Sequence, residues 1–126
     1  MSRFVKPDVV RLNLTGGDYI VVKRQLTAGE QRRVFAKTAK TVKAGQPIEI
    51  DLEKAGISNL VEYLVDWSFT DQDGKPVPIK DMPSEYVVDV LNSLDADSFQ
   101  EITDAINAHE RAVDEEKKTP RSTANA

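Results

Sequence analysis

The sequence has no cysteine and only one histidine and one tryptophan among its 126 residues. Without cysteine, a disulfide, a thiolate metal ligand and a thiol nucleophile are all excluded. There is no run of about 18 apolar residues, so no membrane-spanning helix is expected. The opening segment MSRFVKPDVV has no apolar core, so we expect no secretory signal. This composition is typical of a cytosolic globular protein.

Charge is distributed unevenly along the chain, although the net charge is only −4. Residues 1–48 contain ten Lys and Arg against three Asp and Glu, a balance of +7. Residues 49–126 contain seven against eighteen, a balance of −11. Either the two parts fold against each other and neutralise part of this difference, or they form a dipolar subunit that associates head to tail or binds a charged partner.

The first recognisable unit is a β-hairpin over residues 8–24. Apolar and polar residues alternate in DVVRLNL (8–14) and in DYIVVKR (18–24), as in half-buried strands. Gly16 and Gly17, between the two runs, accept the positive φ of a tight turn. They do not form a phosphate-binding loop, because they lie between strands and no G-x-x-x-x-G-K-[ST] pattern is present.

About four helices are expected after the hairpin, which predicts an α+β fold in a single domain of residues 1–118. Thr27 and Glu30 form a capping-box pattern at the first helix, and residues 46–50 alternate like a short third strand. Apolar residues three and four positions apart mark the remaining helices. The predicted helices span about 27–43, 58–67, 83–94 and 97–118, and residues 119–126 form a flexible tail.

Local signals define several of these boundaries. Residues 51–56 are expected to form a turn, with Ser58 as the N-cap of the second helix. Pro83 suits the first turn of the third helix. Asp97 and Gln100 resemble a capping box for the last helix.

The segment WSFTDQDGKPVPI, residues 67–79, raises the question of a metal loop or a catalytic carboxylate pair. If Gly74 took the sixth position of a calcium loop, Phe69 and Lys80 would take the first and twelfth, where a calcium loop needs oxygen ligands. Two carboxylates in an exposed turn also lack the cleft that would raise the pKa of one of them. We therefore predict a turn in which Asp71 accepts backbone hydrogen bonds and Gly74 supplies positive φ.

His109 is the only histidine and has no nucleophile motif or second metal ligand beside it. We assign no catalytic, cofactor-binding or metal-binding residue and predict a protein that is not an enzyme. The last predicted helix instead carries apolar residues at spacings of three and four, as in a coiled-coil seam. Trp67 and Phe69 either pack in the core or line a partner pocket. The candidate partner-binding residues are Trp67, Phe69, Phe99, Ile102, Ile106 and Val113.

The first predicted helix carries a cluster of basic residues. This face is either simply solvated, or opposed to the acidic last helix, or a site of phosphate contacts. The acidic net charge and the absence of an aromatic platform argue against nucleic acid as the partner. The candidate residues for charge-mediated self-association are Arg32, Arg33, Lys37 and Lys40 against Asp104 and Glu110.

The order of these pieces resembles a known family. An apolar segment ends in DWSF (66–69), DQDGKPVP (71–78) follows, a helix begins at MP (82–83), and the last helix ends in DEEKK (114–118). This pattern, over roughly residues 20–118, resembles the small tail assembly chaperones of long-tailed, siphovirus-type bacteriophages and prophages.

The resemblance implies a non-enzymatic protein in the cytoplasm of the bacterial host. Its partners would be the tape-measure protein, which it keeps soluble, and the tail-tube protein, which it helps to recruit during tail morphogenesis; it could form a homo-oligomer. One alternative is a structural virion component, such as a tail-tube or head–tail joining subunit. Another is a nucleic-acid-binding regulator that uses the basic helix over residues 30–43.

The resemblance generates a prediction at the level of the gene. The family commonly makes a longer form of the protein by ribosomal frameshifting. An A-rich slippery run in the gene can encode the Lys117-Lys118 pair. The alternative explanation of this pair is an ordinary helix C-terminus, where Lys interacts favourably with the helix dipole. We expect the genome to carry a slippery heptamer near codon 117, an overlapping second frame and a very long helical frame downstream. Sequencing the DNA beyond codon 110 checks this, and the lack of both frames would favour the virion-component alternative.

Overall fold

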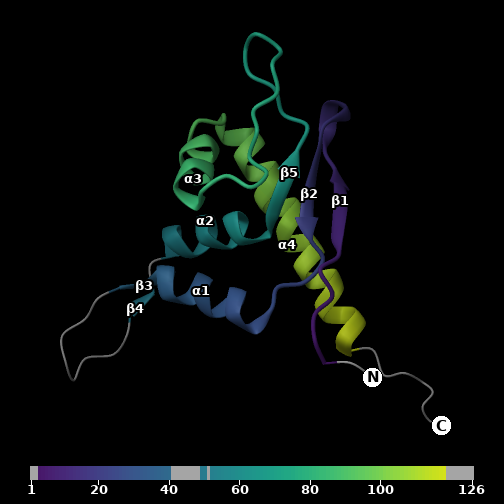
Figure 1. The fold of residues 1–126 in the computed structure, drawn as a ribbon, viewed down its shortest axis with the longest axis vertical. Helices are drawn as coiled ribbons and strands as arrows, with labels where there is room; N and C mark the ends of the chain where they lie inside the picture. Colours follow the sequence, from purple (N-terminus) through teal and green to yellow (C-terminus); the bar gives the residue numbers. More distant parts are fainter. Residues whose placement is uncertain (1–2, 41–48, 51, 119–126) are drawn as a thin grey trace.

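The computed structural model of the chain describes residues 3–40, 49–50 and 52–118. A small antiparallel sheet is followed by a mostly helical part, so the predicted α+β class is confirmed (Figure 1). The elements are β1 (Val9–Asn13), a 3₁₀ turn (Thr15–Gly17), β2 (Tyr19–Lys23), α1 (Ala28–Thr38), β3 (Ala39–Lys40), β4 (Glu49–Ile50), α2 (Leu52–Tyr63), β5 (Leu64–Trp67), α3 (Ser84–Asn92) and α4 (Ala96–Lys118).

The predicted hairpin is confirmed by the antiparallel pairing of β1 with β2, in which Arg11 lies opposite Val21. Gly16 and Gly17 both have positive φ, +69° and +80°. The alternation along β2 leaves Ile20 and Val22 fully buried, at 0% exposure each. One face of the hairpin therefore belongs to the core, as its sequence pattern requires.

The third strand of this sheet is β5, which pairs with β2 and places Trp67 opposite Ile20. The prediction of a helix over residues 58–67 is wrong at both ends. Residues 64–67 are a strand, and residues 52–56, expected as a turn, belong to α2. Leu64, Val65 and Trp67 continue a helical spacing, but they are also typical strand residues, and the open edge of β2 offers them backbone hydrogen bonds.

Helix α1 begins with the predicted capping box. The amide of Thr27 donates to Glu30 Oε1 at 2.8 Å, and the amide of Glu30 donates to Thr27 Oγ1 at 3.1 Å. The helix ends at Thr38 rather than near residue 43, because Ala39–Lys40 pair with Glu49–Ile50 as strands. The expected strand at 46–50 is thus present at its last two residues, and the rest of it lies outside the described residues.

Helix α4 is capped by Asp95 and not by the predicted Asp97. Asp95 Oδ1 accepts from the amide of Ser98 at 2.8 Å, and Asp95 Oδ2 accepts from the Ser98 hydroxyl at 2.8 Å. The helix therefore starts at Ala96, one residue before the expected position. Its end at Lys118 agrees with the prediction, and the expected flexible tail at 119–126 lies outside the described residues.

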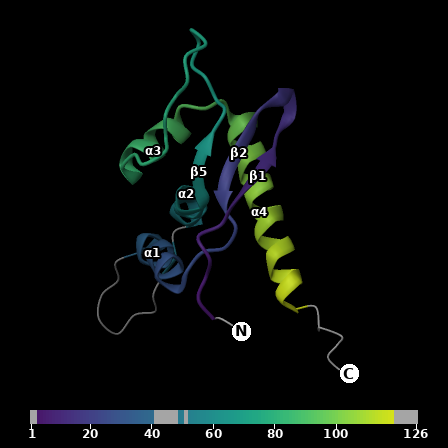
Figure 2. The same ribbon diagram turned by 45° about the vertical axis from the view of Figure 1, so that its right-hand side comes forward.

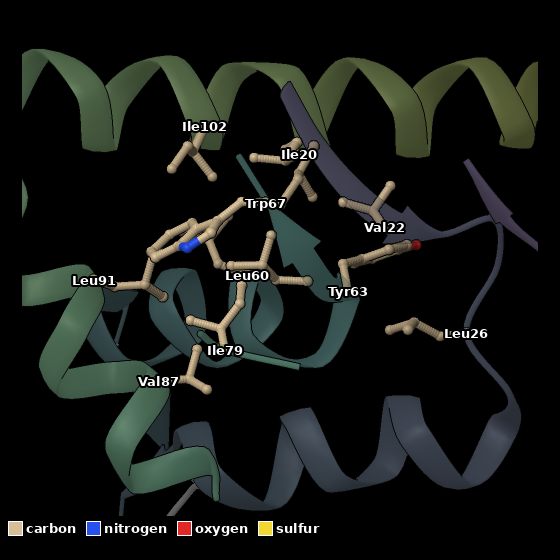
Figure 3. Close-up of a cluster of buried hydrophobic side chains, with 12 residues drawn as sticks. Ile20, Val22, Leu26, Leu60, Tyr63, Trp67, Ile79, Val87, Leu91 and Ile102 are labelled. Carbon is tan, nitrogen blue, oxygen red and sulfur yellow. The ribbon is translucent and has the colours of Figure 1, made fainter. Parts of the chain in front are cut away.

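Trp67 occupies the centre of the core, among Leu60 of α2, Leu91 of α3 and Ile102 of α4 (Figure 3). Leu60, Leu91, Ile102 and Ile106 are at most 1% exposed, so each helix from α2 to α4 contributes a buried side chain to one cluster. Burying such a side chain contributes about 1.5–3 kcal/mol. None of the described helices is long and apolar enough to cross a membrane.

Helix α4 runs along the three-stranded sheet, from the hairpin turn to the far end of β2 (Figures 1 and 2). Near its start, Glu101 accepts from the amide and the hydroxyl of Thr15 at 2.8 and 3.0 Å. Further along, His109 Nε2 lies 2.9 Å from the carbonyl oxygen of Arg24. Near its end, Glu116 pairs with the guanidinium of Arg24 at 3.0 Å. The helix is thus attached to both ends of the hairpin.

The capping box predicts a pH-dependent stability. Burial acts to raise the pKa of Glu30, but its hydrogen bonds with Lys23 and Thr27 outweigh burial and hold the pKa below its ordinary value of 4.5. The stabilisation is therefore complete above about pH 4.5 and is lost as the pH falls through the lowered pKa. We expect Glu30→Gln to lower the free energy of unfolding by about 1 kcal/mol near pH 7, with the deficit shrinking below pH 4.5.

Urea unfolding followed by circular dichroism at several pH values measures this difference. Asp73→Asn, which removes an exposed carboxylate from a loop, serves as the matched control and should show no deficit. A deficit of Glu30→Gln that stayed constant down to pH 3 would show that the charge of Glu30 does not stabilise the fold.

Candidate functional site

An open groove of about 1050 Å³ lies between the hairpin turn, the loop that follows β5, and the adjoining ends of α3 and α4. Its walls come from segments far apart in the sequence, which β5 and α4 bring together. Its apolar lining is Trp67, Phe69, Val77, Tyr86, Val90 and Leu94. Its carboxylates are Asp18, Asp71, Asp73, Asp89, Asp95 and Glu101. We call this surface the acidic groove.

The floor of the acidic groove is an aromatic pair. Trp67 is 7% exposed, and its ring stacks on that of Phe69 with centroids 4.8 Å apart and planes at 24°. The indole Nε1 donates to the carbonyl oxygen of Val77 at 2.8 Å, which satisfies the polar atom of an otherwise buried side chain. This bond also draws the returning loop over the aromatic pair.

The predicted turn at Asp71 to Gly74 is confirmed. Asp71 Oδ1 accepts from the amides of Asp73 and Lys75, at 2.8 and 3.0 Å. Gly74 has a φ of +77°, and the amide of Asp71 donates to the carbonyl oxygen of Lys75 at 2.8 Å. One oxygen of Asp71 is therefore engaged in holding the turn. The described part of the chain contains no group of three or more His, Cys, Asp or Glu residues that could hold a metal ion.

The carboxylates of the groove interact with neutral donors. Ser68 donates its hydroxyl to Asp18 at 3.0 Å, and Glu101 accepts from Thr15 as described above. Hydrogen bonds from the amide and hydroxyl of Ser98 lower the pKa of Asp95. Among the described residues, no Lys, Arg or His lines the groove; Lys75 lies in the adjoining turn but outside the lining. The groove thus keeps a concentrated negative charge.

Basic residues are instead neutralised at the other end of the molecule, around α1. Glu62, which is only 9% exposed, pairs with Arg33 at 2.6 Å and lies 3.7 Å from Lys23. Lys23 also pairs with Glu30. The uneven charge of residues 1–48 and 49–126 is therefore partly neutralised when the two parts fold against each other, which was the first of the two interpretations of the sequence. Part of it is kept by Arg32 and Lys37, both exposed on α1, and by the five groove carboxylates that lie in residues 49–126.

The predicted partner-binding seam on α4 faces the interior. Ile102 and Ile106 are completely buried, and Val113 and Trp67 are each 7% exposed. Phe69 and Phe99 are half-buried against the same core. The α4 side chains among them are therefore not available as an exposed seam, because they pack against the rest of the fold. Of the six residues, the structure places Trp67 and Phe69 at the groove.

The residues predicted for charge-mediated self-association are dispersed. Arg33 is paired with Glu62, and Glu110 accepts from Asn59 Nδ2 at 2.6 Å. Asp104, on the outer side of α4, accepts from Gln100 Nε2 at 2.9 Å. Arg32 and Lys37 are exposed on α1, and the side chain of Lys40, in β3, lies outside the described part. These residues do not form one continuous basic or acidic surface.

His109 has a structural role. Its Nε2 lies 3.2 and 2.9 Å from the carbonyl oxygens of Lys23 and Arg24, so this nitrogen carries the proton and donates it. The ring also meets Tyr63 edge-on, with centroids 6.1 Å apart. Burial, with the charges of Glu110 and Asp114, raises the pKa of Tyr63 to about 12 and keeps its hydroxyl protonated. His109 thus fastens α4 to the end of β2.

Sequence reasoning missed Asp18, Tyr86, Asp89, Asp95 and Glu101 as members of one site. The available signal was the acidic excess of residues 49–126, to which Asp89, Asp95 and Glu101 belong. No local motif marks these positions, since they come from the hairpin turn, α3 and α4 and meet only in the folded chain.

The turn that forms the rim of the groove depends on Asp71. Asp71→Ala removes two hydrogen bonds from the loop, and each contributes about 1 kcal/mol. We expect the backbone order parameters of residues 72–75 to fall from about 0.85 toward 0.6, with little change in global stability because the loop lies outside the core. Nuclear magnetic relaxation measures this, with Gln72→Ala as the control. Unchanged order parameters would show that the turn does not need the carboxylate.

Neither a family model, nor a curated protein, nor a solved structure matches this chain. A functional proposal therefore rests on the residues themselves and on the acidic groove that they form.

Proposed function

We propose that this protein is a non-enzymatic tail assembly chaperone that holds segments of the tape-measure protein in its acidic groove. The order of its pieces supports the chaperone class. The DWSF segment, the DQDGKPVP turn and the helix that begins after Met82-Pro83 resemble that family, and they also supply the floor, the rim and one wall of the groove. The segments that carry the resemblance therefore supply part of the lining, and the hairpin turn and α4 supply the rest.

The observation that carries the proposal is the pairing of an apolar floor with uncompensated carboxylates. Phe69, Tyr86 and Leu94 offer apolar surface to a ligand. Asp73 and Asp89 are exposed beside them. The complementary ligand has an apolar stripe bordered by Lys or Arg, which is the pattern of a basic amphipathic helix bound in a groove. A volume of about 1050 Å³ is at the upper end of the range of small-molecule sites, about 300–1000 Å³, so the open groove has room for a short polypeptide segment.

This chemistry fits the task of a tail assembly chaperone. The client is a very long helical chain whose apolar stripe must stay covered in the host cytoplasm until tail-tube subunits surround it. One groove covers only a short segment, so many copies must bind along one client. Their individually weak contacts add up by multivalency, and each contact can be released as the tube grows. Recruitment of the tail-tube protein would follow from the array of bound copies.

Co-expression with the client tests this function. We expect the tape-measure protein from the same genome to be insoluble alone, and soluble and co-purified when this protein is present. Asp73→Lys combined with Asp89→Lys should reduce the recovered client by about tenfold or more, because like charges then face each other at the rim of the groove. The matched control is Asp104→Lys, which reverses an exposed charge on the outer side of α4 and should leave recovery unchanged.

Two results would count against the proposal. If the wild-type protein is folded and the client still precipitates, the chaperone function is wrong. If the protein is found in fixed stoichiometry in purified tails, it is a structural virion component instead. Equal recovery with the groove variant and the control would place the client elsewhere on the surface.

A further inference from the structure

The two edges of the three-stranded sheet are built differently. The strand order is β1-β2-β5, so β1 and β5 each have one side that faces no other strand of this sheet. The register of β5 with β2 shifts between Val21 and Val22, and such an irregularity bends an edge away from further regular pairing. The register of β1 with β2 is regular along the whole of β1, which contains no proline. Strand β1 is therefore the edge to which another strand can be added.

The hydrogen bonds at the two ends of the hairpin show which backbone groups of β1 face its open side. The amide of Leu14 donates to the carbonyl oxygen of Asp18 at 2.8 Å, and the amide of Arg24 donates to the carbonyl oxygen of Asp8 at 3.0 Å. Hydrogen-bonded pairs alternate along two antiparallel strands, so every second residue of β1 directs both of its backbone groups away from β2. Those residues are Val9, Arg11 and Asn13, and no hydrogen bond between described residues uses their main chain.

The side chains of these three residues leave the open side accessible. Val9 is 55% exposed, and Arg11 and Asn13 are also exposed. A charged side chain often protects an edge strand from further pairing, and Arg11 is the only charged residue in β1. Its guanidinium carbon lies 3.8 Å from the ring centroid of Tyr19, which belongs to β2, and its Nε donates to Asn13 Oδ1 at 3.3 Å. The cation is thus turned over β2 and does not protect the open side.

We propose that β1 pairs with β1 of a second copy, antiparallel and about a two-fold axis, so that the two three-stranded sheets become one. The axis lies at Val10. Val9 of each copy then lies opposite Arg11 of the other, and the two residues of each such pair exchange both of their outward backbone hydrogen bonds. The exposed side chain of Val9 is covered by the aliphatic stem of the opposite arginine.

Two other two-fold registers fit this edge less well. An axis at Arg11 places two arginines directly opposite each other, and like charges in that position destabilise a sheet. An axis at Leu12 places Val9 opposite Thr15, whose amide already donates to a carboxylate at 2.8 Å, so this pair cannot exchange both bonds. The axis at Val10 avoids both problems. It also places the β-branched side chains of the two Val10 residues opposite each other, a pairing that strands favour.

A second copy suits this edge better than a flexible foreign segment. Its β1 is already an ordered strand, with Arg11 held in place by Tyr19, so pairing does not have to order it. A flexible segment would lose conformational entropy when it binds. A contact made by one short strand from each copy buries less than the roughly 1200 Å² of most stable complexes. The dimer is therefore reversible, with a dissociation constant in the micromolar range or weaker.

This inference goes beyond the proposed function and does not rest on it, but it bears on how the grooves are arranged. The acidic groove lies at the end of the sheet where the hairpin turn is (Figures 1 and 2). In an antiparallel pair the two hairpin turns point in opposite directions, so the grooves lie at the two ends of the joined sheet. A dimer is thus bivalent toward a long ligand of the groove, which strengthens binding by multivalency.

Sedimentation equilibrium of the isolated full-length protein tests the dimer. We expect a reversible association between micromolar and millimolar concentrations that stops at two copies. Val9→Pro removes an outward N–H without removing a bond to β2, so it should weaken the dimer by about tenfold or more. The matched control is Val9→Thr, which keeps the N–H and a β-branched side chain and should weaken it by less than about threefold. The far-ultraviolet circular dichroism of each variant reports its fold.

Single cysteine substitutions test the register, since the chain has no cysteine of its own. The two Val10 residues form a pair without hydrogen bonds, in which the Cα atoms are about 4.5 Å apart, and a disulfide can span that distance. We expect Val10→Cys to give a disulfide-linked dimer under mild oxidation and Asn13→Cys to give none. An axis at another residue would instead favour the link from Arg11→Cys or Leu12→Cys.

Three results would overturn the proposal. The wild-type protein stays monomeric at millimolar concentration, or Val9→Pro associates as well as Val9→Thr, or Val10→Cys links less readily than the cysteine variants of Arg11 and Leu12. If the amides of Val9 and Arg11 became protected from hydrogen exchange only after the tape-measure protein is added, the edge would belong to the client and not to a second copy.

These outcomes are distinct from failure of the chaperone function. Val9 does not line the acidic groove, so Val9→Pro should still hold the tape-measure protein soluble if the proposed function is correct. Client binding by a protein that never dimerises would remove only the present inference. A dimer that leaves the client insoluble would remove only the chaperone function.

Discussion

The contact on which the structure depends is the burial of Trp67 with its indole nitrogen bonded to Val77. A buried indole must place its N–H on an acceptor, and here the acceptor is ten residues later, in the loop that returns over the ring. The same residue lies opposite Ile20 in the sheet and packs in one cluster with Leu91 and Ile102 (Figure 3). The sheet, the helices and the loop thus all contact the side chain of Trp67. The groove forms where the stacked pair of Trp67 and Phe69 reaches the surface.

Helix α4 acts as a brace for this arrangement. Its contact with Thr15 through Glu101 holds the hairpin turn against the start of the helix. Its contacts through His109 and Glu116 hold the opposite end of the hairpin. Since Glu101 also lines the groove, the carboxylate that positions one wall contributes to its charge. The shape of the groove is therefore tied to the packing of the whole sheet, although its surface residues are polar.

Signals within a few residues of each other predicted the local features of the fold. The hairpin was predicted from a simple alternation of apolar and polar residues. The capping box of Thr27 with Glu30 and the turn at Asp71 were predicted from residues at most four positions apart. Strand β5 was not predicted, because Leu64 and Val65 continue the helical spacing of Leu60. Only pairing with β2, more than forty residues earlier, makes them a strand.

The candidate site was harder to predict than the fold, for the same reason. The sequence correctly predicted that one face of α4 is apolar. The spacing of these residues does not distinguish a face covered by a partner from a face covered by the same chain. Ile102 and Ile106 turned out to face their own sheet. The acidic residues of the groove are separated by up to eighty-three positions, from Asp18 to Glu101, so no window of sequence contains them together.

The origin of the groove from separate segments has a consequence for how this surface can change over generations. Its carboxylates lie on the hairpin turn, in the loop after β5, and at the ends of α3 and α4. A substitution at one of them alters the charge in one place and leaves the backbone of the others where the core holds it. The preferences of such a surface can therefore change one residue at a time without a new fold.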